Sequence, residues 1–499
     1  MPNLQENNVF KSKITNYMLS CWIFAALTGL MFGYDTGIIA GVTGTDDFLS
    51  KFFPDSYKKR VDELETNYCR DDDKFVGHFK SSIYLAAAVA SFVAAKACSS
   101  LGRRPTLMMA SVFFVSGSLF GAVAQTYPLL LFGRILYGIG IGFATQAAPL
   151  FLTEIAPLEH RGAVNILFQL FVTIGIFVGN LVNYGALIHP SGWRTSVGLA
   201  AVPGLVILVG SFIITESPLS LVERGKETEG KGALRKYRGV EEVDAEYEQL
   251  VTACEQVRRV KHPYLKLVGR SGIPPLFITI IIQVFQQYTG INAIMFYTSV
   301  LLQTMGFQSD MSLLSSLVIG LVNVCSNFML IYVVDRVGRR KLLLVACVQM
   351  FISQVAIGVI LTSHLLETGT LDKSLAAAVV VLVCTFVMAF AWSWGPMGWL
   401  IPTEIFPIET RTAGYSFAVS SNMLFTYVIS QTFLSMMCSF KSLIFFFFSG
   451  WILVMGIFTA FLLPETKGVP VDLMGVCVWR QHPVWKRFFE DDGKSCETT

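Results

Sequence analysis

Asp35 is the residue whose chemistry most needs explaining, because it interrupts an otherwise uncharged apolar segment. A carboxylate at membrane depth costs on the order of 2.5 to 3.5 kcal/mol on insertion scales. Arg134, in a second apolar segment, is the candidate partner. Burial opposes a charged carboxyl group and a nearby cation favours it, so an Asp beside a movable cation can bind a proton on one side and release it on the other. The pair predicts proton coupling. Two alternatives stay open, hydration near helix ends and a static structural pair.

A second group of candidate residues carries uncharged hydrogen-bonding side chains within apolar segments. Amides offer donors and acceptors that match hydroxyl groups, and the sequence shows no basic cluster for a phosphate or carboxylate. Trp399 adds an aromatic face suited to the C–H face of a sugar ring, just after Gly395-Pro396, where we expect the helix to bend. Any one amide could instead join two helices, but the set predicts a substrate cavity. Its members are Gln169, Gln286, Gln287, Asn292, Asn323, Asn422 and Thr426.

Helices that cross a membrane must position these residues. The chain has 499 residues, of which 53% are hydrophobic and only 15% charged, and its mean hydropathy of +0.57 is too apolar for a soluble protein. Apolar runs of about 20 residues predict twelve spans, six in each half. They are 16–42, 79–98, 106–126, 128–150, 162–186, 195–215, 273–303, 311–334, 341–364, 375–402, 411–438 and 443–463.

The second half of the chain repeats the first. Thr153–Ala163 and Thr403–Ala413 match at 7 of 11 positions, and Gly102–Arg104 and Gly338–Arg340 each follow a long apolar segment. Parallel repeats of membrane helices are typical of transporters with a site near the middle of the membrane. The repeat therefore predicts a carrier that alternates access between the two sides, and not an enzyme.

Basic residues in short loops set the expected orientation. The loops that contain 103–104 and 336–341 are expected in the cytoplasm, and both termini with them. The first apolar run is long and lacks a cleavage pattern, so we expect it to be retained. The expected domains are an N-terminal half at 1–215 with an outer lid loop at 43–78, a cytoplasmic linker with short helices at 216–272, a C-terminal half at 273–464 and a cytoplasmic tail at 465–499.

Two of the ten cysteines are expected on the oxidising outer side. Cys69 lies in the lid loop and Cys438 at the outer end of the eleventh span, so a disulfide could tie the lid of one half to the other half. Topology alone leaves this pairing open, because it does not give the separation of the two residues.

Several motifs together resemble the sugar porter branch of the major facilitator superfamily, and the resemblance covers nearly the whole chain. Within that branch the chain is similar to the plant and algal monosaccharide/proton symporters called sugar transport proteins. The branch motifs are Gly133-Arg134, Glu216–Pro218, Gln286–Asn292, Asp335–Arg340 and Pro464–Gly468; the closer match rests on Phe32–Asp35, Asn67–Cys69 and Gly395–Trp399.

The resemblance implies an all-α membrane protein with twelve transmembrane helices in two pseudo-symmetric six-helix halves. It implies that Asp35 is the proton site paired with Arg134, and that Cys69 bonds Cys438. The hexose would be bound by the amide set with Trp399, Phe32 and Ile176. Cytoplasmic ion pairs would hold the outward-open state, formed by Arg103, Glu154, Arg161, Arg339, Glu404 and Arg411.

Three departures from the family pattern change the expectations. Thr36 replaces an apolar residue beside Asp35, where a hydroxyl could alter proton binding. Thr145 stands where the family usually has Asn, and could shift helix packing. The loop before Gly102 lacks the acid that Asp335 supplies in the second half, so we expect one cytoplasmic latch to be weaker.

The sequence as a whole predicts a carrier that moves a monosaccharide inward with a proton as a monomer in the plasma membrane. We expect no metal, no cofactor and no nucleic-acid partner, since the net charge is only +3. The alternatives are an uncoupled facilitator of hexose or polyol and a transport-impaired sugar sensor.

Overall fold

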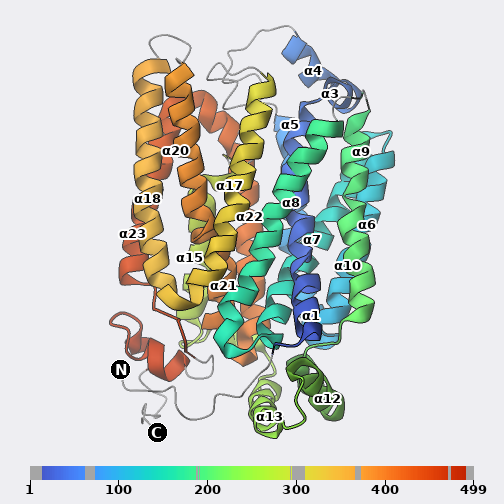
Figure 1. The fold of residues 1–499 in the computed structure, drawn as a ribbon, viewed down its shortest axis with the longest axis vertical. Helices are drawn as coiled ribbons and strands as arrows, with labels where there is room; N and C mark the ends of the chain where they lie inside the picture. The colour runs from blue at the N-terminus through green and yellow to red at the C-terminus, as the bar shows by residue number, and fades with distance from the viewer. Residues whose placement is uncertain are drawn as a thin grey trace.

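The computed structural model describes residues 14–61, 74–186, 189, 191–292, 294, 309–365, 373–469 and 474–489. Long helices form two bundles that lie side by side, with α5, α6, α7 and α8 in one and α17, α18, α20 and α23 in the other (Figure 1). Among the described residues, ten helices are long and apolar enough to cross a membrane. The predicted membrane class is therefore supported by helix length as well as composition.

The first bundle contains six membrane segments, two of them interrupted. The first segment breaks at Leu27 and the sixth at Ala200, and the short helices α3 and α4 lie at one end of the bundle (Figure 1). The helices are α1 (Asn16–Ala26), α2 (Thr28–Gly44), α3 (Asp46–Phe52), α4 (Pro54–Val61), α5 (Lys74–Ser100), α6 (Arg103–Val123), α7 (Tyr127–Ile155), α8 (Arg161–Ala186), α9 (Gly192–Leu199) and α10 (Ala201–Ile213).

The second bundle has helices of similar length, and one of its predicted spans is divided between α20 and α21. Its helices are α15 (Ile273–Tyr288), α17 (Ser309–Val337), α18 (Arg339–Ile360), α20 (Lys373–Ala391), α21 (Trp394–Ile405), α22 (Ile408–Phe440) and α23 (Ile444–Phe461). After α15 the chain turns at Gly290, whose φ is 82°. Most of the rest of the predicted span 273–303 lies outside the described residues.

The break between α20 and α21 corrects the predicted position of the bend. We expected it at Gly395-Pro396, but α20 ends at Ala391 and Ser393 caps α21 with φ −140° and ψ −93°. Pro396 explains the shift, because a proline ring clashes with the carbonyl four residues earlier and therefore breaks a helix one turn upstream.

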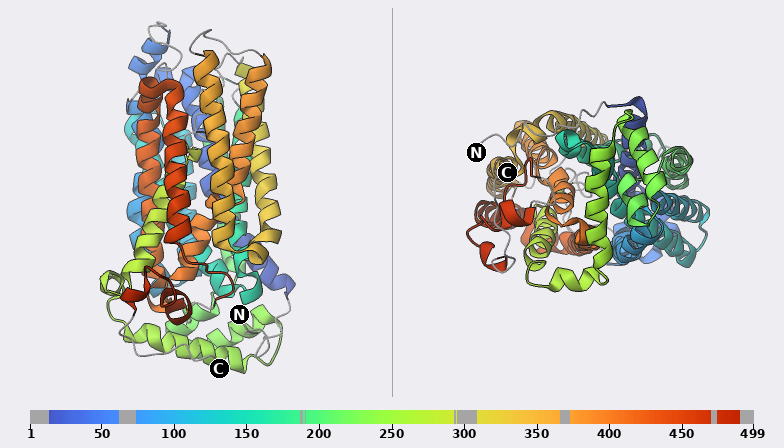
Figure 2. Two further views of the ribbon diagram at one scale, coloured as in Figure 1. Left: turned by 90° about the vertical axis from the view of Figure 1, so that its left-hand side faces the viewer. Right: turned by 90° about the horizontal axis from the view of Figure 1, so that it is seen from below.

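The linker forms helices at the end of the molecule opposite α3 and α4. They are α11 (Pro218–Glu223), α12 (Glu227–Arg238), α13 (Asp244–Arg259) and α14 (Pro263–Val268). Seen from below, α12 and α13 lie across the ends of the bundles (Figure 2). Helix α13 packs on α11 and on α22 of the second half. The linker thus contacts both bundles.

Glycines bring α2 against α8 with little side-chain material between them. A Cβ atom on Gly29, Gly33 or Gly37 would overlap a backbone carbonyl oxygen of α8. In the reverse direction, a Cβ atom on Gly175 or Gly179 would press on the backbone of α2. This close packing of small residues is typical of membrane helix pairs. It fixes the position of Asp35 relative to α8 along the helix axis.

Candidate functional site

The charged pair lies inside the first bundle. Arg134 on α7 bonds the Oδ1 atom of Asp35 on α2 through its Nη1 atom. Its Nη2 atom donates to the carbonyl oxygen of Lys80 on α5 at 3.0 Å, and its guanidinium group lies 5.2 Å from the centre of the Phe79 ring. Three helices therefore meet at one cation, so a change in the charge of Asp35 acts on α2, α5 and α7 together.

Asp35 is buried, which argues against the alternative that its carboxylate is hydrated near a helix end. Its side chain is 1% exposed, against 11% for Arg134. Its Oδ2 atom makes no hydrogen bond within the described part of the chain. The neighbouring Thr36 hydroxyl donates to the Phe32 carbonyl of its own helix at 3.2 Å, so it is turned to the backbone and not to the carboxylate.

Thr145, the second departure, is likewise bonded to its own helix. Its hydroxyl donates to the Ile141 carbonyl at 2.8 Å. A threonine hydroxyl bonded in this way has a hydrogen-bond acceptor inside an apolar bundle and needs no partner on another helix.

An amide cluster lies at the centre of the second bundle. Asn422 on α22 donates through Nδ2 to Gln283 Oε1 at 2.7 Å and to Gln286 Oε1 at 2.5 Å, both on α15. The two glutamines in turn donate to α21, Gln283 to the Gly398 carbonyl at 2.5 Å and Gln286 to the Gly395 carbonyl at 2.8 Å. Three helices are thus joined by neutral groups whose donors and acceptors form hydrogen bonds with one another.

Three more predicted residues adjoin this cluster. Gln287 donates to Gln286 Oε1 at 3.5 Å and accepts a bond from Asn292. The Thr426 hydroxyl donates to the Asn422 carbonyl at 2.8 Å. These residues, drawn from α15, α22 and the turn after α15, line up as one polar region in the second half.

Other predicted residues lie outside that region. Gln169 and Ile176 are on α8, 9% and 8% exposed, and neither makes a hydrogen bond to the amide cluster within the described residues. Asn323 on α17 accepts from Asn327 of the same helix at 3.0 Å through its carbonyl. Its side chain is only 4% exposed.

The aromatic candidates meet rings of the first half. Trp399 on α21 contacts Phe168 of α8 edge to face, with ring centres 5.8 Å apart. Phe32 contacts Tyr84 in the same manner at 6.4 Å. The Trp399–Phe168 contact joins the two bundles, which places this tryptophan where the halves meet.

Gln283 is a cluster member that the sequence analysis missed. It is 0% exposed and precedes Gln286 and Gln287 by three and four residues, the spacing that puts side chains on one helix face. That spacing was the available signal. It was overlooked because Gln283 lies before the Gln286–Asn292 motif.

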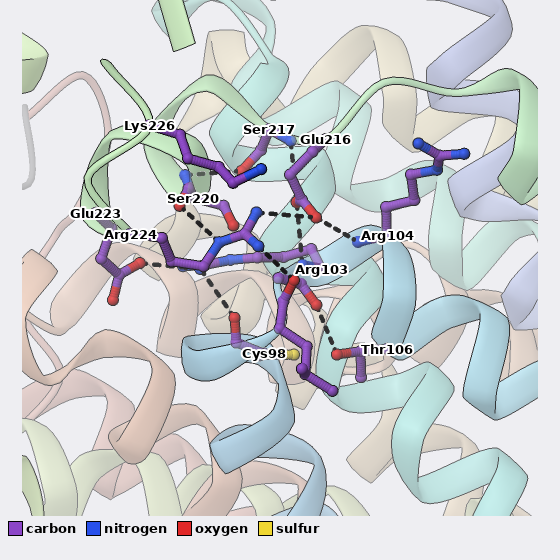
Figure 3. A network of polar contacts seen from close by, with 12 residues as sticks. Cys98, Arg103, Arg104, Thr106, Glu216, Ser217, Ser220, Glu223, Arg224 and Lys226 are labelled. Carbon is purple, nitrogen blue, oxygen red and sulfur yellow. Dashed lines mark hydrogen bonds and ion pairs between the residues drawn. The ribbon is translucent and has the colours of Figure 1, made fainter. Parts of the chain in front are cut away.

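A charged network lies at the end of the first half where the linker begins (Figure 3). Arg103 at the start of α6 bonds Glu154 of α7 at 2.7 Å and Glu223 of the linker at 2.9 Å. The Glu216 carboxylate accepts from the backbone N–H groups of Arg103 at 3.0 Å and Arg104 at 3.1 Å. A carboxylate at a helix N-terminus satisfies N–H groups that lack a partner within the helix.

The second half repeats this arrangement. Arg339 bonds Glu404 at 2.8 Å and Asp335 at 3.1 Å. Glu465 accepts from the backbone N–H groups of Arg339 at 2.9 Å and Arg340 at 3.1 Å. The helices that these glutamates cap both begin after a glycine with φ above 100°. The motifs around Glu216 and Glu465 therefore have a capping role that the sequence did not reveal.

Asp335 also joins the two halves. Its Oδ2 atom accepts from the backbone N–H of Ala163 at the start of α8 at 3.0 Å. In the first half the corresponding acid comes from the linker, since Glu223 bonds Arg103. The expectation of a weaker first latch did not take Glu223 into account, because this residue lies 120 positions beyond Arg103.

The remaining predicted cytoplasmic residues lie near the same networks. Arg411 on α22 is 6% exposed and lines a pocket with Arg103, Glu154 and Glu223. Arg161 begins α8 and is half-buried. Both arginines have partners in the structure.

Of the predicted disulfide, only one residue is described. Cys438 lies near the outer end of α22 and is not among the free thiols, whereas Cys69 lies outside the described residues, as do the three acids of the lid at 71–73. The pairing stays a prediction.

Solved structures share this fold. The proton:xylose symporter XylE bound to 6-bromo-6-deoxy-D-glucose matches with a TM-score of 0.80 at 24% identity, over 92% of this chain and 98% of that one. The inward-open conformation of XylE from E. coli matches with 0.68 at 23% identity, over 91% and 98%.

Curated relatives are much closer in sequence. Sugar transport protein 8 of Arabidopsis thaliana is 55% identical over 490 residues, which are 98% of this chain and 97% of that protein. Sugar transport protein MST4 of Oryza sativa subsp. japonica is 52% identical over 487 residues, 97% and 95% of the two chains. The family model described as "Sugar (and other) transporter" matches residues 21–477. The chain therefore belongs to the sugar transporter family and has the twelve-helix, two-half fold of the major facilitator superfamily.

Proposed function

We propose that this protein is a proton-coupled monosaccharide symporter that works by alternating access. The observation that carries the proposal is the buried ion pair of Asp35 and Arg134 in one half, combined with a neutral amide cluster in the other half. A charge that can be neutralised suits a proton, and amides suit hydroxyl groups. The two relatives described above are named sugar transport proteins, which supports a sugar as the substrate.

The proposed coupling begins at Asp35. Protonation removes the carboxylate charge and with it the attraction to Arg134, so α2 is released from α7. Because α2 packs on α8 through glycines, its movement shifts α8, and with it Phe168, which contacts Trp399. A membrane potential adds about 2.3 kcal/mol per charge per 100 mV to inward movement of the proton.

Sugar binding is assigned to the second half. Hexose hydroxyl groups would exchange for the amide–amide bonds of Asn422, Gln283 and Gln286, so that these groups stay satisfied with and without sugar. Trp399 would cover the C–H face of the ring. The other members of the binding set are Gln169, Ile176, Gln287, Asn292, Asn323, Thr426 and Phe32.

The cytoplasmic networks of Arg103 and Arg339 would hold the inner side closed until both ligands are bound. We place the protein in the plasma membrane as a monomer with both termini in the cytoplasm. The start of α1 and the linker helices lie at one end (Figure 1), where the basic residues of the loops also gather. The domain boundaries given above and a Cys69–Cys438 disulfide complete the proposal.

Uptake of labelled glucose into proteoliposomes tests this function. With an inward proton gradient we expect accumulation above the outside concentration, and a protonophore should return the sugar to equilibrium. Uptake that only equilibrates under both conditions would show an uncoupled facilitator. Glucose binding without uptake would show a sensor, and either result would overturn the proposal.

A further inference from the structure

Tyr137 lies beside the proton site and has no role in the proposed mechanism so far. It follows Arg134 by three residues on α7, so both side chains project from the same helix face. Its side chain is 4% exposed, and its ring packs on Phe114 with centres 4.0 Å apart. Its hydroxyl makes no hydrogen bond within the described part of the chain. A buried hydroxyl without a partner is costly and needs an explanation.

Two further polar atoms without partners lie at the same place. They are Oδ2 of Asp35 and Nε of Arg134. Asp35, Arg134 and Tyr137 line one pocket, whose other walls are mainly apolar residues of α2, α6 and α7 with Phe48 of α3. One acceptor and two donors around a small enclosed space form the kind of site that binds an ordered water molecule.

Tyr137 has a defined set of ionisable neighbours. They are Tyr34 and Asp35 from α2, Tyr84 from α5 and Arg134 from its own helix. The Tyr34 hydroxyl is already committed, because it donates to the Ser196 carbonyl at 2.9 Å. Arg134 is held by Asp35 and by the Lys80 carbonyl. Among these tyrosines, Tyr137 is the one whose buried hydroxyl makes no hydrogen bond within the described residues, and this hydroxyl is therefore the one available to the second oxygen of the carboxylate.

We propose that Tyr137 is a positioning residue of the proton site, which holds a water molecule against Oδ2 of Asp35. The hydroxyl donates to the water and the water donates to the carboxylate oxygen, so the charged form of Asp35 is stabilised on both of its oxygens. Tyr137 then sets the proton concentration at which Asp35 becomes neutral. This inference rests on the proposed function for its meaning in transport, but its geometry stands alone.

An infrared titration of the purified full-length protein in lipid nanodiscs tests the inference. The C=O band of the protonated carboxyl group is assigned to Asp35 by its loss in Asp35→Asn. In Tyr137→Phe the ring and its packing on Phe114 remain, and only the donor is removed. We expect the midpoint of this band to move to higher pH by about 0.5 to 1 unit, because the charged carboxylate loses a hydrogen bond.

Tyr34→Phe is the matched control, since it removes a buried tyrosine hydroxyl that faces Ser196, and its midpoint should stay at the wild-type value. An unmoved midpoint in Tyr137→Phe, or an equal shift in both variants, overturns the inference. If Tyr137→Phe does not yield folded protein, 3-fluorotyrosine at position 137 serves in its place; it keeps the ring, and its more acidic hydroxyl should move the midpoint to lower pH. Failure of glucose accumulation by the wild type would reject the proposed function but would leave this titration decisive for Tyr137.

Discussion

The two halves of the protein are alike at the end that carries the linker and different at their centres. Each end has an arginine that bonds a glutamate and a second acid, and a glutamate that caps the helix the arginine begins. At the centre, the first half buries an ion pair and the second half an amide cluster. In the proposed function, the repeated end would serve both halves as a gate, while the different centres would allow one half to respond to charge and the other to hydroxyl groups.

The largest expected effect comes from removing the charge at the first centre. Asp35→Asn keeps the size of the side chain but cannot exchange a proton. We expect accumulation of labelled glucose in proteoliposomes to fall to the equilibrium level, because coupling is lost. Exchange of glucose across a membrane without a gradient should persist, which separates loss of coupling from loss of folding. Glucose accumulation by this variant would show that the ion pair of the first half is not needed for coupling.

The second centre is tested by Asn422→Ala, which leaves Gln283 and Gln286 without their shared donor. Loss of one or two buried hydrogen bonds, at about 1 to 2 kcal/mol, predicts a rise in the KM for glucose of about 5- to 30-fold. The pH dependence of uptake should stay unchanged. Initial uptake rates at several glucose concentrations and pH values measure both quantities.

Gln349→Ala is the control for that variant. Gln349 is also an amide of the second half, but it joins α18 to α20 by donating to the Thr385 carbonyl at 3.2 Å. We expect its KM to stay within about twofold of the wild type. A similar KM rise in both variants would mean that the amides of α15 and α22 act only in helix packing.

The networks of Arg103 and Arg339 differ in their contacts with the other half, and the variant Asp335→Asn tests this difference. Asp335 bonds Arg339 and also the Ala163 N–H of the other half, so loss of its charge should weaken cytoplasmic closure. Spin labels on cysteines placed at the exposed positions Glu159 and Val337 report the separation of the halves. We expect a larger fraction of long distances in the variant. An unchanged distribution would show that this contact does not hold the halves together.

Glu223→Gln should have the smallest effect. Glu223 bonds Arg103 within the first half and its linker, with no bond to the second half within the described residues. We expect the spin-label distances to match those of the wild type and the free energy of unfolding to fall by about 1 kcal/mol or less, since the side chain is 18% exposed. Thermal unfolding in detergent measures the change in the free energy of unfolding. Longer spin-label distances in Glu223→Gln would mean that the Arg103 network also holds the two halves together.

Hydropathy predicted the helices well because the membrane requires long apolar segments with internal backbone hydrogen bonds. Charge within such a segment singled out Asp35 and Arg134, and these two do contact each other. Uncharged hydrogen-bonding side chains within apolar segments indicated most of the amide set, and the break before α21 was displaced by only a few residues.

What the sequence did not reveal depends on contacts between distant segments. Glu223 and Arg103 are 120 residues apart, and Glu216 and Glu465 cap helices that begin more than 100 residues earlier. Neither spacing nor hydropathy encodes such pairs. Tyr137 was passed over for a related reason, since a tyrosine in an apolar segment is unremarkable until the position of its hydroxyl is known.

The glycine contact between α2 and α8 limits how far one helix can move without the other. Side chains that pack between two helices can change rotamer and absorb a small displacement, whereas touching backbones transmit it. If Asp35 is the proton site, as proposed, a proton bound there would have little chance of moving inward while α8 stays still. The absence of methyl groups at three positions on one helix would then suppress slippage, in which protons leak without cargo.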